Sequence, residues 1–366
     1  MRIAFFGSSL VSAYWNGAAT YYRGIIRALA ARGHQITFYE PDAWDRQQHR
    51  DIADPDWARV VVYRPAEAEA MRVIDEARGA DVLVKASGVG VLDEFLESAI
   101  SEAKSSTVST VFWDVDAPAT LDRIQSNARD PFGELIPTYD AIFTYGGGDP
   151  VVRAYMRFGA RLCVPIYNGL DPATHFPALS EGRFAGDLGF LGNRLPDREA
   201  RVDEFFFHPA RNLPGMQFLL GGAGWGGKSV PSNVTYFDHV YTRDHNAFNS
   251  TPRMVINISR DSMVRYGYSP ATRVFEAAGA AACIITDEWE GIEYFFEPGR
   301  EILVAAGAEE VAAHLAGVTA AEAKKTGEAA FRRALAQHTY AHRAEQVECI
   351  LTGRAANAAG AAERIA

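Results

Sequence analysis

One short segment brings together residue types that could hold a nucleotide. In GYSPATRVFEAAG (Gly267–Gly279), Ser269 is suited to a helix N-cap and Pro270 to the first helical turn. The backbone N–H groups at such a helix start would be free to bind a phosphate. Arg273 and Glu276 would share one face of the helix. There the guanidinium could bind a phosphate, and the carboxylate could accept hydrogen bonds from both hydroxyls of a ribose. The alternative is an ordinary surface ion pair between these two side chains.

Two other turns also follow predicted strands. In VFWDVDAPATL, Asp114 and Asp116 come just after a strand, where one of them could act as a general base toward an acceptor hydroxyl. A turn cap or a solvated pair is the equally weighted alternative. Arg260 follows the strand-like run before Ser259 and could add positive charge at a phosphate site.

One glycine-rich segment matches a nucleotide-binding pattern, and we interpret the match as accidental. LLGGAGWGGKS (Leu219–Ser229) fits the bare spacing of a P-loop, with Lys228 and Ser229 at its end. Pro231 and the strand-like run NVTYF follow at once, so the helix that would seat the phosphates has no room to form. The histidines show no metal-ligand spacing, although His239 and His245 flank one predicted loop, and no metal site is expected.

The elements that must position these residues alternate along the chain. Short apolar runs that read as strands are separated by helical patterns, which predicts parallel sheets covered on both faces. The loop-rich stretch 167–186 is a candidate linker. We therefore expect an α/β protein of two Rossmann-like domains, 1–170 and 186–351, with a ligand-binding cleft between them, a C-terminal helix and an Ala-rich tail, 352–366.

The composition excludes several classes of function. The 366 residues carry a formal net charge of −10, which argues against broad, sequence-independent binding of nucleic acids. Three scattered cysteines, Cys163, Cys283 and Cys349, indicate neither a disulfide framework nor a metal site. The apolar run at the N-terminus is too short for a signal peptide, and no stretch is long enough to span a bilayer. A cytoplasmic protein is expected.

Taken together, the motifs of the second half resemble a known family. The pieces SPATRVFEAAG, IITDEWEGIEYFF, EPGREILVA and HTYAHRAEQV, in this order, are similar to group 1 glycosyltransferases, and most similar to the CgeB-like, spore-maturation branch. The resemblance implies a GT-B fold, an N-terminal acceptor domain and a C-terminal domain for a UDP-, GDP- or dTDP-linked sugar. It also implies metal-independent transfer without a cofactor, weighted towards retention of configuration, to a glycan, lipid, protein or small-molecule acceptor.

The resemblance also assigns residues. It implies that Glu276 binds the ribose of the donor and that the turn with Gly192, Asn193 and Arg194 approaches its diphosphate. Either Arg194 or Arg198 could supply positive charge there, and the alternative for each is a solvated loop with a helix N-cap at Asp197. Many relatives carry a second glutamate eight residues before the first, and this chain has Tyr268 there. The incomplete motif keeps two alternatives open: a nucleotide-sugar epimerase or hydrolase on the same scaffold, and a non-catalytic nucleotide-sugar-binding protein.

Overall fold

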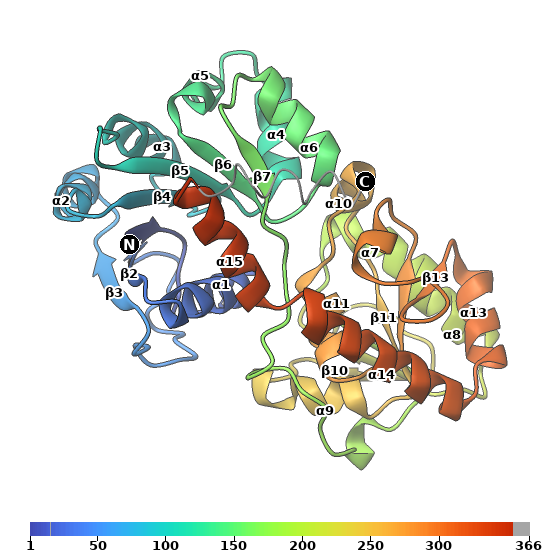
Figure 1. The fold of residues 1–366 in the computed structure, drawn as a ribbon. Helices are drawn as coiled ribbons and strands as arrows, with labels where there is room; N and C mark the ends of the chain where they lie inside the picture. The colour runs from blue at the N-terminus through green and yellow to red at the C-terminus, as the bar shows by residue number, and fades with distance from the viewer. Residues whose placement is uncertain (15, 354–366) are drawn as a thin grey trace. The chain divides into compact units, whose positions relative to one another are not determined.

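Two parallel β-sheets organise the chain in a computed structural model, which describes residues 1–14 and 16–353 (Figure 1). The first sheet has the strand order β3-β2-β1-β4-β5-β6-β7. This parallel order, in which strands are added on one side of β1 up to β3 and on its other side from β4, is that of a Rossmann-like domain. Its strands are β1 (Arg2–Phe6), β2 (Gln35–Pro41), β3 (Arg59–Tyr63), β4 (Val82–Ala86), β5 (Ser109–Asp114), β6 (Ala141–Thr144) and β7 (Cys163–Pro165).

Helices alternate with these strands, as the sequence predicts. They are α1 (Ala19–Ala31), α2 (Glu67–Ala77), α3 (Asp93–Glu102), α4 (Ala117–Ser126), α5 (Pro131–Leu135) and α6 (Gly148–Arg157). α1 ends where Gly33 adopts a φ of 87°, a left-handed conformation that glycine accepts at little cost.

The last helix, α15 (Tyr340–Leu351), packs beside α1 (Figure 1). Its buried residues Tyr340, Ala344 and Val347 join the core of the first sheet. Gly24 of α1 makes this possible, because a Cβ at that position would lie 2.2 Å from the ring of Tyr340. The end of the chain is therefore tied to its beginning.

The second sheet repeats the same topology with the order β10-β9-β8-β11-β12-β13. Its strands are β8 (Leu188–Leu191), β9 (Phe218–Gly221), β10 (Val234–Phe237), β11 (Met254–Asn257), β12 (Ile284–Asp287) and β13 (Leu303–Ala305). Its helices are α7 (Pro196–Val202), α8 (His208–Asn212), α9 (His245–Ser250), α10 (Asp261–Tyr266), α11 (Thr272–Gly279), α12 (Ile292–Phe295), α13 (Ala308–Gly317) and α14 (Ala320–Gln337). A capping box between Thr319 and Glu322 begins α14.

The two compact units have boundaries that differ from those expected. The first contains residues 1–167 together with the chain from Tyr340, and the second is Asn168–Thr339. The expected linker belongs to the second unit, because Ala178 and Glu181 donate backbone hydrogen bonds to Ser250 and Thr251 beside α9. The expected 186–351 domain loses its last helix to the first unit, through the contacts of Tyr340. Most of the predicted tail, 352–366, lies outside the described residues.

The expected α/β architecture of two Rossmann-like units is thus confirmed. Within the part of the chain that the structure describes, none of the helices has both the length and the apolar composition needed to span a membrane.

Candidate nucleotide site

The start of α11 differs from the prediction by two residues. Ala271 is the N-cap, and Pro270 precedes the helix. Gly267 and Tyr268 form a turn with positive φ angles of 67° and 43°. This turn lets the hydroxyl of Ser269 donate to the carbonyl of Gly267, at 2.8 Å, so Ser269 does not cap α11. The helix begins without a side-chain cap. The N–H of Val274 donates to the carbonyl of Ala271, at 3.0 Å, and the N–H groups of Thr272 and Arg273 remain for an anion.

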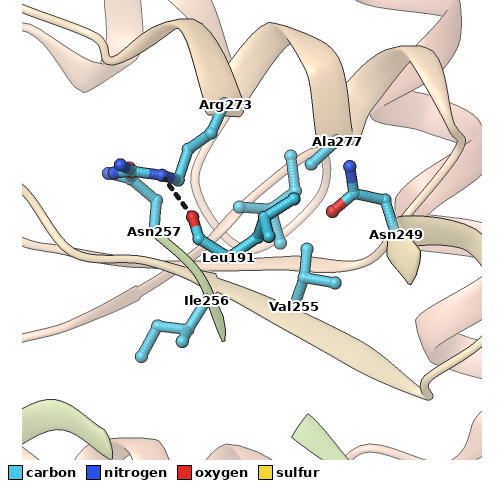
Figure 2. A pocket seen from close by; sticks show the side chains of 8 residues that line it. Leu191, Asn249, Val255, Ile256, Asn257, Arg273 and Ala277 are labelled. Atoms are coloured by element: carbon cyan, nitrogen blue, oxygen red, sulfur yellow. Dashed lines mark hydrogen bonds between the residues drawn. The ribbon is translucent and has the colours of Figure 1, made fainter. Parts of the chain in front are cut away.

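Arg273 of α11 donates hydrogen bonds to the ends of two strands, β8 and β11. Its Nε donates to the carbonyl of Leu191, at 3.0 Å (Figure 2). Its Nη1 donates to Asn257 Oδ1 and to the carbonyl of Ile258, at 3.1 and 3.2 Å. Within the described chain no salt bridge joins Arg273 to Glu276. The ion pair considered as an alternative is therefore not formed.

Gly192, directly after β8, lies against two guanidinium groups. A Cβ at this position would be 3.0 Å from Arg198 Nη2 and 3.3 Å from Arg273 Nη2. Asn193 supports the turn, because its carbonyl accepts from Arg198 and its Oδ1 accepts from the backbone of Ala223. The missing side chain of Gly192 thus leaves room beside two converging cations.

Arg198 occupies a buried position that its local sequence does not reveal. Its side chain is buried, at 4 % exposure, and among the described residues its Nε has no hydrogen-bond partner and its guanidinium no carboxylate partner. Burial lowers the pKa of Arg198 to about 9, and the neighbouring guanidinium of Arg273 acts in the same direction. A buried cation beside a second cation marks a site for an anionic ligand. The only local signal was an arginine two residues after a proline that could start a helix.

Other cations near this turn are held by carboxylates. Arg194 forms two hydrogen bonds with Glu199, at 2.7 and 2.8 Å, and Arg260 donates to Asp197, at 2.6 Å. Lys228 of the glycine-rich segment lies between Glu199 and Asp203, at 2.9 and 2.6 Å. The segment leads into β10 rather than a helix, which confirms that its P-loop pattern is accidental.

Tyr268 packs against a second glycine. A Cβ on Gly291 would lie 2.3 Å from Cδ1 of the tyrosine ring, and the backbone N–H of Tyr268 donates to the carbonyl of Glu290, at 2.6 Å. Tyr268 therefore holds the loop before α12 close to the start of α11.

Glu276 lies one turn further along α11 and is half-buried. Its carboxylate has neither a hydrogen bond nor a salt bridge within the described chain, so both oxygens can accept from a ligand. His175 and His245 lie close to it. Burial lowers the pKa of His245, while the charge of Glu276 acts in the opposite direction.

The two aspartates of the first unit differ in role. Asp114, at the end of β5, is fully buried and accepts hydrogen bonds from Ser87 (2.7 Å), the backbone of Asp116 (3.0 Å), Thr120 (3.0 Å) and Tyr155. Burial raises the pKa of Asp114. Its carboxylate is thus enclosed by hydrogen-bond donors of its own unit, and this geometry favours Asp116 over Asp114 as a base. Asp116 begins α4 and is half-buried.

A small cavity lies below Arg273, and Figure 2 shows the side chains around it. It is lined by Leu191, Asn249, Val255, Ile256, Asn257, Arg273, Ala277 and Ile284. Its volume of about 10 Å³ is at the lower limit for a single water molecule. It is a packing void, and the candidate site is the open turn at Gly192.

Known proteins resemble this chain in sequence over its second half and in fold over nearly its whole length. Residues 198–348 match a family described as "Glycosyl transferase-like". No curated protein sequence matches significantly.

Solved structures share the fold across nearly the whole chain. Sucrose-phosphate synthase from Thermosynechococcus elongatus has a TM-score of 0.73 and 13% identity, covering 98% of this chain and 100% of its own. Alr3699/HepE from Anabaena, in complex with UDP and glucose, has a TM-score of 0.67 and 13% identity, covering 96% and 100%. The β-glucosyltransferase of phage T4 has a TM-score of 0.57 and 13% identity, covering 96% and 99%. The chain has the GT-B fold, and the family match supports a glycosyltransferase of group 1.

Proposed function

We propose that this protein transfers a sugar from a nucleoside-diphosphate donor to an acceptor hydroxyl. The observation that carries the proposal is the pair of guanidinium groups of Arg198 and Arg273 beside Gly192, neither with a carboxylate partner in the described chain. The diphosphate of the donor would supply the missing negative charge. The bound UDP of Alr3699/HepE, which has the same fold, makes a uridine nucleotide the first candidate.

The chemical step follows from the charges. When the bond between the sugar and the diphosphate breaks, negative charge develops on the leaving phosphate oxygens. Arg198, Arg273 and the uncapped first turn of α11 would stabilise that charge, in a role that needs no metal ion. Glu276 would accept hydrogen bonds from the ribose, because its carboxylate is without a partner in the described chain. If the transfer inverts configuration, Asp116 of the first unit would take the proton of the acceptor; if it retains configuration, as the resemblance favours, the departing phosphate would take that proton.

Calorimetric titration with UDP, GDP, dTDP and UDP-glucose tests the donor half of this proposal. We expect one nucleotide to bind, and Arg198→Met to weaken its binding by about 10- to 100-fold, since a hydrogen bond to a charged group contributes roughly 1.5–3 kcal/mol. Glu276→Gln should weaken it by about tenfold. Arg300→Met is the matched control, because Arg300 is exposed and paired with Glu297 on the surface.

The outcomes separate the proposal from its alternatives. If neither a nucleoside diphosphate nor a nucleotide sugar binds, the proposal is wrong. If UDP-glucose binds and is consumed without any acceptor, an epimerase or hydrolase is favoured. If it binds but no acceptor extract supports turnover, the protein is a nucleotide-sugar-binding protein without catalysis.

A further inference from the structure

Three side chains that are far apart in the sequence converge beside α11. They are His175 from the segment before β8, His245 at the start of α9, and Glu276 of α11. One nitrogen or oxygen of each residue lies within 4.8 Å of those of the other two. A tetrahedral zinc site places its ligand atoms roughly 3.4 Å apart, given bond lengths near 2.1 Å. Small side-chain rotations would therefore suffice to bring these atoms onto one ion.

Hydrogen bonds around the two imidazoles leave each with a lone pair. His245 Nε2 lies 3.1 Å from the carbonyl of Val240. A carbonyl only accepts, so Nε2 carries the proton and Nδ1 keeps its lone pair. A hydrogen bond from one ring nitrogen to a backbone carbonyl is also the usual support of a metal-binding histidine.

His175 is oriented by the same logic. The hydroxyl of Thr174 donates to the carbonyl of Asp171, at 3.2 Å, and lies 3.0 Å from His175 Nδ1. Having donated its one proton, the hydroxyl accepts from Nδ1, which leaves the lone pair on Nε2. Both histidines thus present a nitrogen in the form that binds a metal ion.

The backbone around the cluster is held in place. Asn246, the neighbour of His245, donates its side-chain amide to the carbonyl of Thr174, at 2.9 Å, and accepts from the backbone N–H of Phe176, at 3.3 Å. These two bonds bracket His175 and fix its segment on α9. Ser250 of α9 then donates to the carbonyl of Ala280, at 2.9 Å, which ties α9 to the end of α11. The backbone segments that carry the three residues are therefore held together by hydrogen bonds within this unit.

We propose that His175, His245 and Glu276 bind a divalent transition-metal ion of the zinc class. Two imidazole nitrogens and one carboxylate form a donor set that suits Zn²⁺, whereas Mg²⁺ and Ca²⁺ prefer sites made of oxygen atoms. The carboxylate of Glu276, without a partner in the described chain, supplies the negative charge. Three protein ligands leave a fourth position open to water or to a ligand hydroxyl. The proposed ion shares Glu276 with the proposed ribose site and shares no residue with the turn at Gly192.

Zinc titration of the full-length, untagged protein tests the proposal without any assay of transfer. Every protein carries Cys349→Ser, because this thiol is half-buried while those of Cys163 and Cys283 are buried, and an accessible thiolate would compete for zinc. We expect one Zn²⁺ to bind, and His175→Ala, His245→Ala and Glu276→Gln each to weaken binding about tenfold or more. His239→Ala is the matched control, since His239 is exposed on the segment before α9 and lies outside the cluster, and it should bind Zn²⁺ as the parent does.

Cobalt substitution gives a second, independent readout. Co²⁺ in a site of low coordination number with nitrogen and oxygen ligands absorbs visible light strongly, and this band should be lost in His245→Ala. Glu276→Gln preserves the shape of the side chain, so it stays informative even if a histidine variant fails to fold. The proposal is overturned if the parent binds no Zn²⁺, or if binding survives all three substitutions. A loss in His239→Ala equal to that in His245→Ala would also contradict it.

Discussion

Arg198 and Arg273 direct their Nη2 atoms at the same point beside Gly192, where a Cβ would lie 3.0 and 3.3 Å from them. A methyl group here would press on both guanidinium groups and on the ring of Phe190, which lies 3.0 Å from the same position, and would push the two cations away from the turn. Gly192→Ala should therefore weaken nucleotide binding about tenfold, a loss of roughly 1.4 kcal/mol.

Calorimetry of this variant needs a control that adds the same methyl group elsewhere. Gly215→Ala serves, because no atom lies within 4 Å of a Cβ at that position. It should bind nucleotide like the parent. Equal affinities of Gly192→Ala and the parent would remove the diphosphate from this turn.

The sequence was informative where one local rule decides the structure. Apolar periodicity predicts the strand β1 and the alternation of strands with helices, and the structure has both. Local rules failed where the fold overrides them. The left-handed turn at Gly267–Tyr268 turns the hydroxyl of Ser269 away from the helix that it was expected to cap.

Other features depend on segments that meet only in the folded chain. The burial of Arg198 depends on its position beside Arg273, which comes from another element, and no local pattern reports it. His175 and His245 belong to no motif spacing, since their approach to Glu276 results from the packing of a loop and two helices. Likewise, the attachment of the last helix to the first unit depends on the match between Gly24 and Tyr340.

The contact between Tyr268 and Gly291 predicts a loss of stability that can be separated from backbone strain. Gly291 has a φ of 90°, and an added Cβ would also collide with the tyrosine ring. Gly299 has a similar φ of 78°, but nothing lies within 4 Å of its Cβ position. Gly299→Ala should cost about 1–2 kcal/mol of unfolding free energy from the left-handed backbone alone. Gly291→Ala should cost about 1–3 kcal/mol more from overpacking.

Urea denaturation of the two variants measures this difference. If both lose the same amount, the ring of Tyr268 does not constrain the loop before α12.

Substitutions of the two aspartates of the first unit should have different effects, one on stability and the other on catalysis. Asp114→Asn disturbs the carboxylate that Ser87, Thr120 and Tyr155 share, so we expect a clearly lower melting temperature. Asp116→Asn should leave the melting temperature nearly unchanged and lower kcat by about 100-fold or more, as expected for a lost general base. An unchanged kcat in Asp116→Asn would instead favour proton transfer to the departing phosphate, the route associated with retention of configuration.

His245 predicts a pH dependence of stability. Burial lowers its folded-state pKa below the ordinary value of 6.5. As the pH falls below 6.5, the unfolded chain therefore takes up a proton before the folded one does, and the free energy of unfolding decreases until the folded pKa is reached. His245→Gln should reduce this decrease and leave only the part that His34 contributes, whose pKa burial also lowers, whereas the exposed His239→Gln should keep the whole decrease. Unfolding curves at about pH 7.5 and about pH 5.5 measure the effect, and an identical pH response of His245→Gln and the parent would contradict it.

Glu276 belongs both to the proposed metal cluster and to the proposed ribose site, which predicts competition between the two ligands. A carboxylate that binds an ion through one oxygen can no longer use both of its oxygens to accept hydrogen bonds from the two ribose hydroxyls. Saturating Zn²⁺ should therefore weaken nucleotide binding, and by linkage a saturating nucleotide should weaken Zn²⁺ binding by the same factor. We expect about tenfold in each direction. His175→Ala separates the two sites, because it removes a metal ligand and leaves Arg198, Arg273 and Glu276 intact. In this variant nucleotide affinity should match that of the zinc-free parent and should no longer respond to Zn²⁺. If Zn²⁺ weakens nucleotide binding equally in the parent and in His175→Ala, the ion acts elsewhere, for example on the nucleotide itself.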